Sequence, residues 1–510
     1  MENDYSKADA LFEVIPSFLR KPEHVARWKN SRESATFRFL RKPVNLEEIN
    51  KYRHPLAIWR ENNTFTYIRT EGYYDTPKDE RGSLSLEFYG YHFLKLWITG
   101  ERKHAITETA TFFMSLAEKK EERKLLVIPS NRNDFDFRSA RSQFFKRFFE
   151  IDPTRELHLE HMILSIEQSV FLTTRSHSVK LSLWSCTVQD GCTAFVDHLL
   201  SRESSFGSLE FAWSPAISDG NLQRLFQSDK IEHLKLPRLK TELALLPFSM
   251  QLDSLDYRIS FESFLEADFQ SLNIVAKKLY LDVYHEGGII PPECLLSFFR
   301  GVAALGHFVE LSINIDSDHD EYYFPVPDSV VQELIRAVLA NSNMKVFRLC
   351  PESLLFYWEP HSATLLKAFK AHKELTEFAL IVHDEELSFG PDFIYLRQLL
   401  LHDRKFTVVN PNGPNCFAND SIEDLYSLNH FYNGSANLVA EPLTERSSLV
   451  MTTLMEMASE DFQRSSLLLS DHVDVLCELV RFAGLNDEHL VRNDRHQSTH
   501  QTTVPKRRRI

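Results

Sequence analysis

The sequence predicts an α/β solenoid, a curved parallel sheet with helices along its outer side. Three observations predict this fold class. A short apolar-x-apolar element recurs along the middle of the chain, and helical patterns separate its copies. The 510 residues include 39 phenylalanines and only 15 glycines, a composition that favours large buried interfaces. Because one strand with one helix cannot bury its own apolar face, neighbouring units are expected to stack.

The recurring element places an apolar residue on either side of a central residue, which is the alternation of a strand with one buried face. Successive copies start 21 to 36 residues apart, which gives each unit room for a strand, a turn and a helix. The ten copies are Leu157 with Leu159, Leu181 with Leu183, Leu209 with Phe211, Leu234 with Leu236, Leu255 with Tyr257, Leu279 with Leu281, Leu311 with Ile313, Phe347 with Leu349, Phe378 with Leu380, and Phe406 with Val408.

Helical spacing between these copies is clearest over residues 328–339, where Val331, Leu334 and Val338 fall on one face. Ser329 and Gln332 are spaced as a capping box in its first turn. A doubly wound sheet or a barrel also alternates strands with helices. Those folds use long strands rich in Val and Ile, whereas the present elements are short and led by leucine. The stacked solenoid is therefore favoured.

Two segments of the middle region, SVKLSLWSCTVQDGCTAFVDHL and IEHLKLPRL, resemble leucine-rich repeats of the ribonuclease-inhibitor type. The C-terminal stretches LYSLNHFYNGSANLVAEP and MEMASEDFQRSSLLLSDHVDVLCELV resemble the end of an uncharacterised microalgal group of leucine-rich-repeat proteins. The resemblance covers residues 84–483 and implies a solenoid with irregular repeats that binds other proteins. The chain departs from the family pattern in one respect, since the Asn that normally follows each strand is mostly missing.

The ends of the chain differ from the repeats. We expect an N-terminal cap or small adaptor-like region at 1–83, repeats at 84–410, a helical C-terminal cap at 411–485 and a disordered tail at 486–510. Further strands are expected at Thr64–Ile68, Leu94–Ile98 and Leu125–Ile128.

Residues around Ile15, Pro16 and Trp28 allow an alternative interpretation of the N-terminal region. They match a few apolar positions of an F-box, which would make the protein a substrate receptor of a ubiquitin ligase. The capping role is favoured over this alternative, because a solenoid needs an atypical end to cover its terminal core.

Composition and motifs argue against most other functions. The net charge of -14 disfavours a nucleic-acid partner, and neither a signal peptide nor a membrane-spanning stretch is evident. Six cysteines without a Cys-x-x-Cys fit a reducing compartment, cytoplasmic or nuclear. No catalytic motif, metal-ligand spacing or cofactor fingerprint occurs, so we expect no enzyme and no cofactor. The basic end Lys506, Arg507, Arg508 and Arg509 is either a candidate nuclear-import signal or an ordinary solvated tail.

The central residue of each strand element is expected on the face of the sheet away from the helices. These residues are His158, Ser182, Glu210, Lys235, Asp256, Tyr280, Ser312, Arg348, Ala379 and Thr407, and their charges sum to zero with His neutral. The alternation adds Asp282 and Tyr284 beside Tyr280. Because rigid aromatic residues concentrate interface energy, we expect a protein partner to bind at Tyr280, Asp282, Tyr284, Lys235 and Arg348. The alternative is that the tyrosines only cover neighbouring strands.

Overall fold

The computed structural model describes residues 11–481, with gaps at 22–23, 30–32, 51–55, 70–76, 79–82, 91–93, 117–121, 130–133, 152, 214–216, 286–290, 318–323, 350–355, 383, 411–419 and 459–460. The basic end and the predicted disordered tail lie outside the described residues. The chain divides into two compact units, one up to Tyr357 and one from Trp358 onward. The boundaries expected from the sequence stay predictions.

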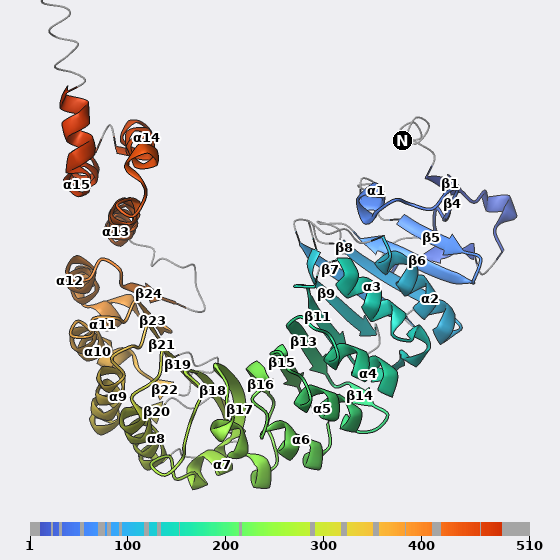
Figure 1. Ribbon diagram of the computed structural model, residues 1–510, viewed down its shortest axis with the longest axis horizontal. Coiled ribbons are helices and arrows are strands. Elements are labelled where there is room, and N and C mark those ends of the chain that lie inside the picture. Colours follow the sequence, from blue (N-terminus) through green and yellow to red (C-terminus); the bar gives the residue numbers. More distant parts are fainter. Residues whose placement is uncertain are drawn as a thin grey trace, which may run out of the picture. The chain divides into compact units, whose positions relative to one another are not determined.

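Parallel strands form the main layer of the first unit (Figure 1). In spatial order they are β9 (Glu122–Pro129), β11 (Glu156–Glu160), β13 (Val179–Trp184), β15 (Gly207–Ala212), β16 (Ile231–Leu236), β17 (Ser254–Ser260), β18 (Lys278–His285), β19 (Glu310–Ser317) and β21 (Val346–Leu349). The first residue of each predicted pair from Leu157 to Phe347 aligns with the next one, and each is at most 2% exposed. These strands confirm the α/β class and are compatible with a solenoid.

Helices connect most of these strands and cover one face of the sheet (Figure 1). They are α4 (Ile166–Thr173), α5 (Thr193–Leu200), α6 (Asp219–Leu225), α7 (Phe261–Glu266), α8 (Pro292–Leu305) and α9 (Asp328–Ala340). Between β16 and β17 two short 3-10 turns take the place of a helix, which explains why this spacing is the shortest. The capping box expected at Ser329 is wrong, because α9 begins after Pro327 without a side-chain cap. A capping box is instead formed by Ser165 and Gln168 at α4.

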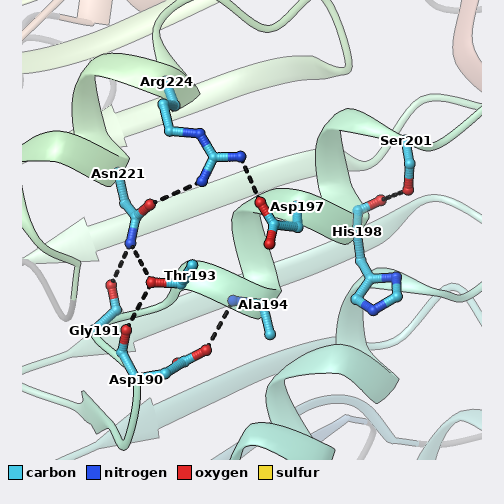
Figure 2. A network of polar contacts seen from close by, with 9 residues as sticks. All are labelled: Asp190, Gly191, Thr193, Ala194, Asp197, His198, Ser201, Asn221 and Arg224. Atoms are coloured by element: carbon cyan, nitrogen blue, oxygen red, sulfur yellow. Dashed lines mark hydrogen bonds and ion pairs between the residues drawn. The ribbon is translucent and has the colours of Figure 1, made fainter.

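Polar contacts join neighbouring units on the helical side of the sheet (Figure 2). The Asn221 amide on α6 donates to the carbonyl oxygen of Gly191 and to the hydroxyl of Thr193, both at 3.0 Å. Arg224 donates to the Asn221 amide oxygen at 3.1 Å and pairs with Asp197 on α5. Since Asn221 is only 6% exposed, its hydrogen bonds fix the position of α6 against α5.

Antiparallel strands precede the parallel ones. They are β1 (Phe12–Val14), β4 (Phe37–Phe39), β5 (Leu56–Arg60), β6 (Thr64–Arg69), β8 (Leu94–Gly100) and β7 (Leu84–Gly90), and β7 pairs with β9. Only β4 and β5 pair in parallel among them. Helices α1 (Leu46–Asn50) and α2 (Lys103–Met114) also belong to this region, and α3 (Gln143–Ile151) lies between β9 and β11. The three additional strands expected from the sequence are confirmed as β6, β8 and β9.

The second unit continues the alternation and then becomes helical. Its elements are α10 (Ser362–Phe369), β23 (Glu377–Leu380), α11 (Glu385–Phe389), α12 (Ile394–His402), β24 (Thr407–Val409), α13 (Asp420–Leu438), α14 (Leu443–Thr453) and α15 (Phe462–Asp471). Phe378 aligns with Val408, two residues beyond the expected alignment with Phe406. Ala379 is 1% exposed, so its expected place on the accessible face is wrong. None of the helices in the described ranges combines the length and the hydropathy needed to span a bilayer.

Candidate functional site

The parallel strands of the first unit present an accessible face opposite the helices, which we call the open face. In-register pairing brings the central residues of eight strands into one row across it. This row is His158, Ser182, Glu210, Lys235, Asp256, Tyr280, Ser312 and Arg348. The alignment of the row expected from the sequence is therefore confirmed in this unit, whereas His158 and Ser182 are only 6% and 8% exposed. The rigidity of the row follows from the strand hydrogen bonds and the buried leucines on either side.

A hollow of about 900 Å³ lies on the open face between β13 and β19. Four of the five predicted contact residues line it, namely Lys235, Tyr280, Asp282 and Tyr284. The fifth, Arg348, has its guanidinium 6.0 Å from the centre of the Tyr280 ring. Residues from six strands, β13 and β15 to β19, thus surround one space. Its volume is near the upper end of the range of about 300–1,000 Å³ that ligand pockets span.

Small side chains produce the hollow. Trp184 on β13 aligns with Ala212 on β15, so a bulky side chain on one strand faces a methyl group on the next. Pro237 directly follows the aligned end of β16, and it also lines the hollow. On the next strand Arg258 again has a long side chain. The floor is therefore formed by Ala212 and Pro237, with larger side chains at both sides.

Charged side chains in the hollow are paired with one another. The Lys235 Nζ lies 3.5 Å from a carboxylate oxygen of Glu210 and 3.4 Å from one of Asp256. The Arg258 Nε lies 3.1 Å from Asp282. With Arg238, the lining has three cations and three carboxylates. The hollow is therefore neutral in sum, and it does not have the row of cations that a phosphate-binding groove needs.

The central Lys235 is held in its charged form. Burial alone would lower its pKa, but the carboxylates of Asp256 and Glu210 together raise it. Burial raises the pKa of the Asp256 carboxyl, and this effect exceeds the opposing attraction of Lys235. Asp256 therefore takes up a proton more readily than a free aspartate would, although Lys235 lies beside it.

The two tyrosines are fixed by their neighbours. The Tyr280 hydroxyl donates to a carboxylate oxygen of Glu310, and burial, with this hydrogen bond, raises the Tyr280 pKa. The guanidinium groups of Arg238 and Arg258 lie 5.2 Å and 4.8 Å from the ring of Tyr284. Both rings are half-buried and held by several contacts. Such preorganisation lowers the entropy that is lost on binding.

Trp213 is a lining residue that the sequence reasoning missed. It directly follows β15, its side chain is 79% exposed, and its backbone has a φ of 64°. His161 and Ser185 follow β11 and β13 in the same left-handed conformation, with φ of 50° and 48°. The missed signal was a large aromatic residue directly after the strand, in a turn position where the neighbouring units have other residue types.

His158 differs from its expected state. The sequence placed it as an exposed histidine, but it is only 6% exposed and its ring lies 4.6 Å from that of Trp184. Burial lowers the pKa of His158 to about 4, so the imidazole is neutral at pH 7. Trp184 on the neighbouring strand β13 contributes to this burial through the contact between the two rings.

Three of the four cysteines that the structure describes are buried. No group of three His, Cys, Asp or Glu side chains in the described ranges is placed to hold a metal ion. Burial raises the pKa of Cys186 and Cys192 to about 12 and that of Cys294 to about 11. At neutral pH these groups are thiols, which are poor nucleophiles.

No protein-family model matches this chain, and no curated protein matches it either.

The F-box interpretation of the N-terminal region gains no support from the positions of its residues. Ile15 is 8% exposed and Trp28 is 2% exposed, and Trp28 packs in an apolar cluster with Tyr67 and Trp97. A partner that recognised these two side chains would have to open the strands around them. The basic end of the chain, Lys506 to Arg509, stays a prediction.

Proposed function

We propose that the chain is a non-enzymatic scaffold that binds a partner protein through the open face. The observation that supports this most directly is the neutral hollow, in which half-buried tyrosines and paired charges are fixed on in-register strands. Tyr and Arg side chains of this kind dominate the energy of protein interfaces. The balance of charge favours a protein partner over a nucleic acid.

We also propose that the stacked units are leucine-rich repeats of the ribonuclease-inhibitor type. Support comes from Cys186, which stands three residues after Leu183, where the repeat consensus has Asn or Cys. Its thiol donates to the carbonyl oxygen of Leu159 in the preceding unit, at 3.2 Å. In this unit Cys186 therefore satisfies a backbone group that the missing Asn would otherwise satisfy.

The test of the scaffold function compares partner capture by the parent chain and by a variant with Tyr280→Ala and Tyr284→Ala. We expect the affinity for the captured partner to fall at least about tenfold, because truncation of such contact residues costs more than about 1 kcal/mol each. Tyr395→Ala in the second unit is the matched control, since Tyr395 is 41% exposed and remote in sequence. Equal affinity of the folded double variant and the parent would overturn the proposal.

A further inference from the structure

Trp213 combines two features that are unfavourable for the folded chain by itself. A left-handed backbone is rare for a residue with a bulky side chain, because Cβ approaches the following carbonyl oxygen. Its indole is also mostly exposed to water at the margin of the hollow. Glycine at this position would avoid both costs. His161 and Ser185 adopt a similar φ at the corresponding turns of the preceding units, so the backbone conformation belongs to the turn, and the exposed indole is what distinguishes Trp213.

The surroundings of Trp213 favour a neutral, apolar ligand group. The floor beside it is formed by Ala212 and Pro237, and the ring of Trp184 also lines the hollow. The nearby cations already have partners, since Lys235 lies between two carboxylates and Arg258 is paired with Asp282. A phosphate or a cationic ligand would compete with these pairs.

We infer that Trp213 is the principal contact of a subsite that takes a flat apolar ring, aromatic or proline, from an extended segment of the partner protein. This inference rests on the proposed scaffold function and specifies the ligand. An indole face stacks on such rings, and grooves lined by aromatic residues bind extended proline-containing segments. The hollow crosses the strands from β13 to β19, so it accommodates several residues of an extended chain.

The experiment selects random ten-residue peptides on the intact chain and measures their affinity for Trp213→Ala and Trp213→Gly. We expect the selected peptides to share an aromatic residue or a proline and to bind both variants at least about tenfold more weakly. Trp213→Gly should melt at or above the temperature of the parent, since glycine adopts positive φ without strain. This result separates a lost contact from a lost fold. Phe462→Ala is the control, because Phe462 is an 87% exposed aromatic in the second unit.

Each other outcome overturns the inference. These outcomes are peptides that bind the parent and Trp213→Ala equally, the absence of peptides that bind below 1 mM, or selected peptides defined only by charged residues. Cellohexaose is the probe for a neutral oligosaccharide. If it binds in a way that depends on Trp213 while no peptide binds, the subsite takes a carbohydrate instead.

If the natural partner is lost with the Tyr280 and Tyr284 replacements but retained with Trp213→Ala, the scaffold function stands and the subsite fails. If the partner is retained by all variants, the open-face function itself fails.

Discussion

Replacing His158 with Phe should reduce the loss of folding stability that the first unit undergoes when the pH is lowered. Phe keeps a flat ring against Trp184 and cannot take up a proton. The folded parent holds His158 neutral with a pKa of about 4, whereas an unfolded chain has a His pKa of about 6.5. Between these values the unfolded state binds more protons, so the free energy of unfolding falls as the pH is lowered.

The size of the effect follows from the two pKa values. The stabilisation by the neutral imidazole is complete above about pH 6.5 and is lost progressively as the pH falls towards 4, by about 3 kcal/mol in total. At pH 5 the loss relative to pH 8 is about 2 kcal/mol. Glu210 and Glu87 oppose the shift, while Lys124 and Lys235 add to it.

Urea unfolding followed by tryptophan fluorescence at pH 8 and pH 5 measures the effect. The parent should lose about 2 kcal/mol more stability over this interval than His158→Phe. The control is His233→Phe, which makes the same replacement at an exposed position on β16, and because it retains His158 the loss of stability seen in the parent should persist. Identical pH profiles for the parent and His158→Phe would refute the assignment of a buried neutral imidazole.

Three further predictions concern packing. Gly301→Ala should destabilise the chain by about 1–3 kcal/mol in urea unfolding, because the new Cβ would lie 2.5 Å from a backbone oxygen. At Gly220 a new Cβ would have no atom within 4 Å, so Gly220→Ala should leave the stability unchanged or raise it slightly. A larger loss of stability for Gly220→Ala than for Gly301→Ala would contradict the packing of α8. Asn221→Ala should cost about 1–3 kcal/mol in the same assay, while Ser201→Ala should cost little. In maleimide labelling followed by mass spectrometry, the exposed Cys477 should react well before Cys186, Cys192 and Cys294, and faster labelling of a buried thiol would contradict its burial.

The strand layer of the first unit was predictable from the sequence because each strand has one buried face. Two apolar residues separated by one position specify a strand and also its register, since a slip by one residue would turn both to water. The variable spacing has a physical source as well. The longest intervals contain α8 and α9, with 14 and 13 residues, whereas the shortest contains only 3-10 turns.

Other features depend on neighbours that the local pattern does not specify. Phe406 and Val408 are both buried on one face, and a shift of two residues turns neither to the other face, so the alternation fits two registers and pairing with β23 selects the later one. The burial of His158 depends on Trp184, a residue 26 positions away. Trp213 was missed because the left-handed turn after β15 has no glycine to mark it.

The antiparallel strands at the start of the chain affect how binding is best assayed. Residues 1–80 include β5 and β6, and β6 provides the hydrogen-bonding partner for one side of β8. A chain shortened to begin after residue 80 would present the backbone N–H and C=O groups of β8 to solvent along a strand of seven residues. Such an edge pairs readily with another copy, so the shortened protein should self-associate and adsorb unrelated proteins. Binding regions are therefore better located by single side-chain replacements than by truncation.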